Sequence, residues 1–233
     1  MIKLQNITKY YDTDNGRKYI FKEASVVLPS MVNIGVLGKN GAGKSTFLRL
    51  IGGATYQDSG KFITDENISW PVGFKGCLQG GLTAKQNTAF VCMLMQKDSQ
   101  TAKKIIEFVH HFSDLGADFD LPVKTYSTGM KARLGFAVSL AFDFDTYLID
   151  EILSVGDANF KKKSKEAIKE KFSNSRLIIV THSAKKIKDY CQKVLLIKDG
   201  KFILYDDINE GLEAYKNIPT NMKDKKQDED DDD

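Results

Sequence analysis

Cysteine is scarce in this chain, which has three cysteines among its 233 residues. They are Cys77, Cys92 and Cys191, an odd number whose spacing is not that of a metal site. A disulfide framework is therefore not expected. Free thiols without such a framework indicate a reducing compartment.

Long apolar runs are also missing. The longest, Leu134 to Phe142, is about half the length that a helix needs to cross a bilayer. The N-terminal stretch Met1 to Asn6 has no apolar core of a signal peptide, and no internal repeat is visible. We therefore expect a cytosolic chain, for which any membrane role comes through a partner.

Charge of one sign does not dominate the chain, but it is distributed unevenly. Residues 219–233 carry three lysines and seven carboxylates, so they contribute −4 and the remaining residues +7 to the total of +3. Such a segment cannot bury apolar surface, and we expect it to be a disordered acidic tail. A mildly basic body is compatible with an anionic surface, although ordinary solvated lysines explain it more simply, and we expect no nucleic-acid partner.

Glycines are concentrated in the most informative stretch, Gly38-Lys39-Asn40-Gly41-Ala42-Gly43-Lys44-Ser45-Thr46. It follows the apolar run Val32 to Leu37, which predicts a buried strand, and precedes the periodic run Phe47 to Ile51, which predicts a helix. This context is typical of a P-loop. The glycines let backbone N–H groups point at phosphate oxygens, and the helix dipole adds positive charge. An incidental glycine-rich turn does not explain the flanking strand and helix.

Two side chains of this loop have predicted roles. Lys44 can reach the β- and γ-phosphates of a nucleotide, and the Ser45 hydroxyl is placed to bind Mg²⁺. The loop therefore predicts a nucleoside triphosphate and Mg²⁺ as its ligands.

Two further buried strands end in polar side chains. Thr146 to Asp150 is followed by Glu151, and Arg176 to Val180 delivers His182. Open α/β sheets bind ligands at the carboxyl ends of their strands. Asp150 can hold Mg²⁺ through water, and Glu151 can orient or deprotonate the attacking water. His182 can donate to the γ-phosphate and hold that water. Lone histidines and acidic turns are more often structural, but their position at strand ends beside a P-loop favours a functional role.

A second anion site is predicted where Ser127 caps an apolar helix that runs through Leu140. One P-loop satisfies one triphosphate, so a second site of this kind hints that two copies share their nucleotides.

Between the P-loop and the Ser127 helix lies a glycine-rich linker with Gln79, a residue that can enter or leave a phosphate site. A helix follows in which Thr83 and Gln86 form a capping box, and its predicted core face comprises Phe90, Val91, Leu94 and Met95.

Near the N-terminus, residues 2–28 predict short strands with a hairpin turn at Asp12 to Gly16 and a further strand at Ser25 to Leu28. Tyr11 precedes the turn. An aromatic ring at this place can stack on adenine, and a packing role is equally compatible with it.

Taken in order, these motifs resemble the ATP-binding subunit of ABC transporters over residues 2 to 217. The resemblance implies an α/β fold with a RecA-like core, an antiparallel β subdomain and a helical subdomain at about residues 80–140, all within residues 1–218. It implies that Tyr11 stacks on adenine, that Gly38 to Thr46 is the Walker A loop, and that Gln79 belongs to the Q-loop. Asp150 and Glu151 then form the Walker B pair, Asp157 belongs to the D-loop, and His182 is the switch histidine.

The signature stretch Ser127-Thr128-Gly129-Met130-Lys131 departs from the usual Ser-Gly-Gly-Gln at Thr128 and Met130, which leaves Ser127 and the Gly129 amide to contact phosphate. Together with Ile68 to Gly73 and Val155 to Asp157, it is similar to the ATPases of polysaccharide exporters, closest to the capsular type. An O-antigen or teichoic acid exporter is the alternative. The O-antigen type often adds a C-terminal sugar-binding domain, for which about fifteen tail residues leave too little chain.

The resemblance implies two copies packed head to tail around two ATP molecules, with a membrane permease as partner, at the cytoplasmic face of the bacterial inner membrane. A soluble ABC protein usually joins two ATPase units or inserts coiled coils, and neither is present. A P-loop kinase would leave the Ser127 motif and His182 without a role.

Overall fold

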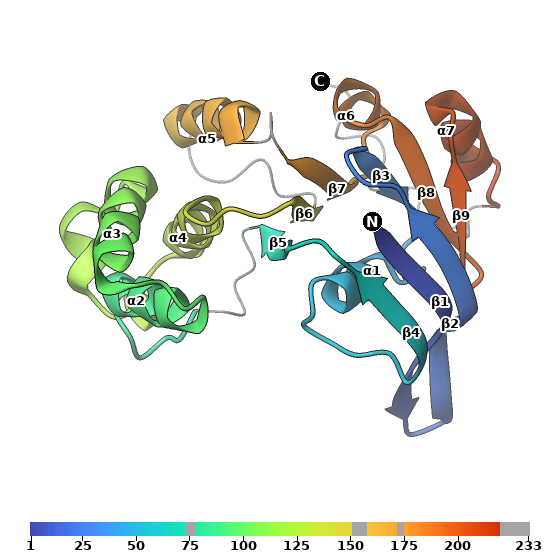
Figure 1. The fold of residues 1–233 in the computed structure, drawn as a ribbon, viewed down its shortest axis with the longest axis horizontal. Helices are drawn as coiled ribbons and strands as arrows, with labels where there is room; N and C mark the ends of the chain where they lie inside the picture. Colours follow the sequence, from blue (N-terminus) through green and yellow to red (C-terminus); the bar gives the residue numbers. More distant parts are fainter. Residues whose placement is uncertain (73–77, 151–157, 172–174, 220–233) are drawn as a thin grey trace. The chain divides into compact units, whose positions relative to one another are not determined.

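The chain folds into two compact units in a computed structural model that describes residues 1–72, 78–150, 158–171 and 175–219. The first, here called the sheet unit, comprises Met1–Trp70, Asp145–Glu151 and Asn174–Asp233. The second, the helical unit, comprises Pro71–Phe144 and Ile152–Ser173. Figure 1 shows the strands of the first and the helices of the second.

A six-stranded sheet forms the centre of the sheet unit, in the order β5-β6-β7-β3-β8-β9. Its central strand β3 (Ile34–Leu37) runs parallel to β7 on one side and to β8 on the other, and β6 runs parallel to β7. Every residue of β3 and β7 is buried, as expected for parallel strands that are covered on both faces. The other strands are β5 (Ile68–Val72), β6 (Thr146–Asp150), β7 (Arg176–Val180), β8 (Lys193–Lys198) and β9 (Lys201–Tyr205).

A separate three-stranded antiparallel sheet has the order β2-β1-β4. The predicted short strands are in fact two long ones, β1 (Ile2–Thr13) and β2 (Gly16–Leu28), joined by the predicted turn and flanked by β4 (Ser59–Thr64). Ser25 to Leu28 is the end of β2 and not a further strand. Register shifts interrupt the alternation of the hairpin, and Asn6 and Glu23 have positive φ there, so one bulged strand resembles several short ones in sequence.

Aromatic packing joins the two sheets to the helix that follows the glycine-rich loop. The ring of Phe202 lies 4.8 Å from that of Phe21 and 5.5 Å from that of Phe47 on α1 (Lys44–Ile51). All three side chains are buried. Helices α6 (Ala184–Tyr190) and α7 (Ile208–Lys216) complete the unit. A Cβ at Gly211 would lie 2.6 Å from Val194, so α7 packs with its backbone close to β8.

The helical unit is built around three phenylalanines, of which Phe112 and Phe136 are stacked and Phe160 packs edge-on against both. Phe112, Phe136 and Phe160 lie with ring centroids 5.7 to 6.1 Å apart. The predicted caps are present: Thr83 and Gln86 form a capping box, and Ser127 accepts from the Met130 amide. The helices are α2 (Ala84–Leu94), α3 (Ser99–Ser113), α4 (Thr128–Leu140) and α5 (Ala158–Lys171), with short 3₁₀ turns at Gly116–Asp120 and Val123–Thr125.

The predicted core face of α2 is wrong. Leu94 is 63% exposed and Phe90 and Met95 are half-buried, so Val91 alone of the predicted set is buried. The reason is a polar side chain. Asn87 is 1% exposed, and its amide nitrogen donates to the carbonyls of Gln79, Leu82 and Thr83. These bonds fix the rotation of the helix and turn its apolar end residues outward.

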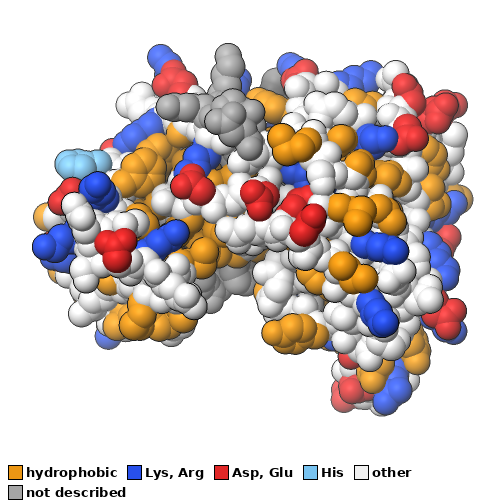
Figure 2. Space-filling model, in the orientation of Figure 1, with side chains coloured by type: hydrophobic (Ala, Val, Ile, Leu, Met, Phe, Trp, Pro, Cys, Tyr) orange, Lys and Arg blue, Asp and Glu red, His pale blue; other side chains and the backbone are white. Residues whose placement is uncertain are grey.

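The surface carries mixed charge. On the face seen in Figure 2, lysine and arginine side chains are interspersed with aspartate and glutamate over both units. This is the pattern of an ordinary solvated surface.

A buried ion pair between Arg176 and Glu66 links the beginning of β7 to the residues just before β5 in the sheet unit. The Arg176 side chain is 1% exposed, and its Nη2 lies 2.8 Å from Oε2 of Glu66 in a contact without hydrogen-bond geometry. Nε of Arg176 donates to the Thr146 hydroxyl at 2.7 Å. Burial alone would raise the pKa of Glu66, but hydrogen bonds from the Met1 ammonium and Thr146, together with the charge of Arg176, outweigh burial and lower that pKa.

Replacing Arg176 with methionine should lower the free energy of unfolding at pH 7 by about 3–5 kcal/mol, because Glu66 is left without its buried partner. A carboxylate with a depressed pKa stabilises the fold above its unfolded value of about 4.3, and this contribution disappears as the pH falls through the folded value. The loss caused by Arg176→Met should therefore shrink between pH 5 and 3, as measured by urea unfolding. Arg17→Met, at an exposed arginine on the hairpin, is the control and should leave the midpoint unchanged. An equal loss at pH 3 and pH 7 would contradict the prediction.

Candidate nucleotide-binding site

The glycine-rich loop connects β3 to α1 in a conformation that requires glycine at particular positions. Gly41 and Gly43 have φ of 80° and 103°. A Cβ at Gly43 would lie 2.6 Å from Cγ2 of Ile20, and one at Gly38 would lie 2.7 Å from the Ile197 carbonyl oxygen. Helix α1 begins at Lys44, and Gly43 caps it without a side-chain hydrogen bond. Backbone N–H groups at such a helix start form an anion site.

The Lys44 ammonium lies within this loop. Nζ donates to the Gly38 carbonyl at 2.6 Å and to the Lys39 carbonyl at 3.2 Å. A cation is thereby held beside the N-terminus of α1, where helix dipole and lysine charge act on the same point. Ser45 and Thr46 occupy the first turn of the same helix.

A cavity of about 360 Å³ opens over the loop. Because β6, β7 and β3 are parallel neighbours, their carboxyl ends meet at one edge of the sheet, and the residues at these ends line the cavity. Asp150 and His182 were expected at this edge from their positions at the ends of predicted strands. The lining comprises Lys18, Ile20, Asn40, Gly41, Gly43, Lys44, Ser45, Thr46, Asp150, Val180 and His182.

Three residues of this neighbourhood were missed by the sequence analysis. Lys18 and Ile20 line the cavity from β2, and the Tyr215 hydroxyl lies 3.2 Å from Nδ1 of His182. Tyr215 lies on α7, 33 residues further along the chain, and fixes one ring nitrogen of the histidine. No sequence signal identifies these residues, because each is an ordinary amphipathic position in its own element.

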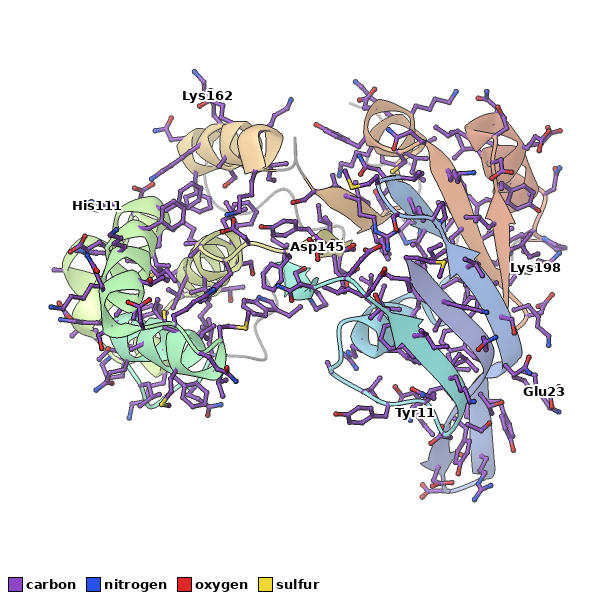
Figure 3. All side chains as sticks on the ribbon, viewed as in Figure 1. Tyr11, Glu23, His111, Asp145, Lys162 and Lys198 are labelled. Carbon is purple, nitrogen blue, oxygen red and sulfur yellow. The ribbon has the colours of Figure 1, made fainter. Side chains whose placement is uncertain are left out.

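Tyr11 does not line the cavity described above, and its side chain is 40% exposed. It pairs directly with Lys18 across the hairpin. Directly paired residues of antiparallel strands point to the same face, so Tyr11 projects on the face from which Lys18 reaches the cavity. Figure 3 labels Tyr11 on this hairpin. Adenine stacking by Tyr11 stays a prediction.

The helical unit holds the other described candidates. The Gln79 backbone is clamped by Asn87, whose Oδ1 accepts from the Gln79 amide at 2.7 Å. The Ser127 hydroxyl accepts from the Met130 amide at 3.2 Å and so caps α4, with Gly129 exposed in the first turn. Glu151 and Asp157 lie outside the described residues, as do residues 220–233 of the acidic segment.

The donors of the cavity fit a hard cation. Ser45 and Asp150 both line it and supply a hydroxyl and a carboxylate oxygen, the ligand types that Mg²⁺ prefers. Within the described ranges, no group of three or more His, Cys, Asp or Glu could hold a metal by itself. This is compatible with Mg²⁺, which usually takes one or two protein ligands and completes its shell with phosphate and water.

The parallel sheet, the strained glycine loop and the lysine at the helix start together define a P-loop nucleotide-binding protein. Comparisons with known proteins narrow this class. The sequence pattern of the ABC transporter family matches residues 21–154, and the chain belongs to that family, among its ATP-binding proteins.

Similar proteins carry specific names. The chain is 46% identical over 217 residues to the polysialic acid transport ATP-binding protein KpsT of Escherichia coli, which covers 93% of this chain and 96% of that protein. It is 39% identical over 219 residues to the capsule polysaccharide export ATP-binding protein CtrD of Neisseria meningitidis serogroup B, covering 94% and 100% of the two chains.

The fold is also that of a solved ATP-binding cassette. The dimeric structure of MJ0796 in a post-hydrolysis state, bound to ADP and Pi, matches with a TM-score of 0.72 at 20% identity and covers 88% of this chain and 98% of that one. The predicted fold class, an α/β ABC-type ATPase with an antiparallel β sheet and a helical part, is confirmed.

Proposed function

We propose that this chain is the ATP-hydrolysing subunit of an ABC exporter that drives capsular polysaccharide across the cytoplasmic membrane. The observation that carries the proposal is the 46% identity to a polysialic acid transport protein over nearly the full length of both chains. The 39% identity to a capsule polysaccharide export protein of another genus supports the same cargo class.

The proposed working unit is a pair of copies packed head to tail around two ATP molecules. Lys44, Ser45 and the loop amides of one copy hold the triphosphate, with Gly38, Asn40, Gly41, Gly43 and Thr46 forming its cradle and Tyr11 stacking on adenine. Ser127 and Gly129 of the second copy complete the site from the other side, and Asp157 is proposed to contribute to the same site. The start of α4 supports this role, because its exposed first turn can donate N–H groups to phosphate.

Within this arrangement the polar side chains have defined tasks. Ser45, Asp150 and Gln79 are the residues that would hold Mg²⁺, which screens the phosphate charges when bound. Glu151 accepts a proton from the attacking water, and His182 donates to the γ-phosphate oxygen while the Tyr215 hydroxyl holds its other nitrogen. Gln79 transmits the conformational change that accompanies hydrolysis to the membrane partner. It lies in a linker whose backbone is held by Asn87, which accepts a hydrogen bond from the Gln79 amide.

The proposed partner is an integral membrane permease. The proposed location follows from this partner: the chain binds the permease at the cytoplasmic face of the inner membrane. Among the helices that the structure describes, none has the length and apolar character of a membrane span.

The shared nucleotide site has a direct test. Glu151→Gln should prevent hydrolysis while it leaves binding intact, so Mg·ATP should convert this variant from one copy to two in size-exclusion chromatography with light scattering. Adding Ser127→Arg to Glu151→Gln should keep the chain as a single copy. The large, charged arginine side chain would occupy the place where Ser127 of the second copy contacts the triphosphate. A dimer that forms equally with Ser127→Arg would contradict the proposed sandwich.

The cargo is tested in the native host. Deleting the gene for this chain should leave capsular polysaccharide inside the cell and remove it from the surface. The wild-type chain should restore export and the Glu151→Gln variant should not. Normal surface polysaccharide in the deletion strain would contradict the proposed cargo while leaving ATP binding unaffected.

A further inference from the structure

A second cavity, of about 470 Å³, lies beside the glycine-rich loop within the sheet unit. Its walls come from β2, from the loop and from the turn between β8 and β9. Ile218, which follows α7, also lines it. It shares Lys18, Ile20, Asn40 and Gly41 with the nucleotide cavity, so the two cavities are neighbours.

The lining of this second cavity is strongly basic. It contains the four lysines Lys18, Lys22, Lys39 and Lys198 and the single carboxylate of Asp199, a net charge of +3. Figure 3 labels Lys198 at the end of β8. The cavity is here called the lysine cavity.

The ammonium nitrogen of one of these lysines is buried without a hydrogen-bond partner, although the residue as a whole is half-buried. Among the described residues, the Lys39 ammonium is one of three buried side-chain polar groups that have no hydrogen-bond partner. A buried charge without a counter-charge is costly, so the position favours an anion beside it. Lys22 and Lys198 are exposed at the rim and can contact the same anion.

The chain itself supplies an anion that is tethered at this place. Ile218 lines the lysine cavity, and residues 219–233 follow it with seven carboxylates and three lysines, a net charge of −4. An extended chain spans up to about 3.5 Å per residue, so Asp228 can reach any point within about 35 Å of Ile218. A short tether of this kind gives an effective concentration on the order of millimolar.

We propose that the acidic segment 219–233 binds in the lysine cavity of its own chain and competes with the phosphates of the nucleotide. Its carboxylates accept hydrogen bonds from the ammonium groups of Lys22, Lys39 and Lys198. Lys18 and the loop residues Asn40 and Gly41 belong to both cavities, so a bound segment adds negative charge where the triphosphate must enter. The segment thereby lowers the affinity for ATP. This regulation rests on nucleotide binding at the loop and is independent of the exported cargo.

The contact is tested by zero-length cross-linking of the full chain. A carbodiimide joins a carboxylate to a lysine amine as an amide and takes up the water that is lost. Mass spectrometry should find links from residues 228–233 to Lys22 or Lys198, and 0.5 M NaCl should suppress them. Lys162, an exposed lysine of α5 that Figure 3 labels, is the internal control and should not be linked. Links that form equally to Lys162, or that persist at high salt, would overturn the proposal.

The regulation is tested by neutralising the segment without shortening the chain. Replacing Asp228 and Asp230 to Asp233 with asparagine and Glu229 with glutamine should tighten Mg·ATP binding by about threefold to tenfold at 50 mM salt, because several exposed ion pairs are lost together. The difference should disappear at 0.5 M salt. The double variant Lys22→Gln/Lys198→Gln should tighten binding similarly in the unaltered chain, since neither lysine lines the nucleotide cavity. Lys162→Gln should change nothing.

Combining the two sets of changes separates a tethered ligand from a free one. The lysine variants should have no further effect once the segment is neutral. If they change ATP affinity equally with either segment, the cavity serves a free anion such as phosphate, and the proposal is wrong. If the cross-links form but the chain does not bind ATP, the contact between the acidic segment and the lysine cavity is supported. The proposed function as an ATP-hydrolysing subunit is then contradicted.

Discussion

Replacing Lys44 with methionine should weaken Mg·ATP binding by about 100-fold to 1,000-fold. The ammonium is the one side-chain cation held inside the loop by the Gly38 and Lys39 carbonyls, at the start of α1. A charge-assisted contact to phosphate that is lost in this way is worth about 3–4 kcal/mol. Isothermal titration calorimetry with the purified chain measures the change directly.

The methionine side chain has a similar length, so the loop should keep its fold. The control is Lys61→Met on β4, an exposed lysine that should leave ATP affinity unchanged. Thermal unfolding of both variants distinguishes a lost contact from a lost fold. Binding of Mg·ATP by Lys44→Met within about threefold of the wild type would contradict the assignment of the phosphate-binding lysine.

Replacing His182 with alanine should lower ATP turnover by about 100-fold to 1,000-fold while ATP affinity changes little, because the histidine acts on charge that develops during hydrolysis. The ring lines the same cavity as Lys44 and Asp150, at the carboxyl end of β7. Steady-state turnover and equilibrium binding measured on the same preparation separate the two effects. An equal loss of affinity and turnover would assign His182 to ground-state binding instead.

Tyr215→Phe offers a matched variant, because it removes the hydroxyl 3.2 Å from Nδ1 of His182 and keeps the ring. We expect turnover to fall by about threefold to tenfold with an unchanged dissociation constant for ATP, and no additional loss in the double variant with His182→Ala. A purely structural role for Tyr215 would instead lower the unfolding temperature and leave turnover per folded chain unchanged.

Much of the local structure followed from the sequence, because the interactions that define it are short in range. The P-loop is a continuous segment in which glycines permit positive φ, and a phosphate is bound by the amides of that same segment. The caps at Thr83 and Ser127 join residues three positions apart. Asp150 and His182 were expected at one edge because the carboxyl ends of parallel strands meet there.

Long-range packing decided the rest. The sequence by itself determined the phosphate loop, the strand ends and the helix starts, since each depends on neighbours within a few residues. Only the tertiary structure decided that Tyr215 holds His182, that Arg176 pairs with Glu66, and that Asn87 rotates α2 away from its most apolar face. These contacts join positions whose residue types are compatible with many partners, and the partner is selected only when whole elements pack.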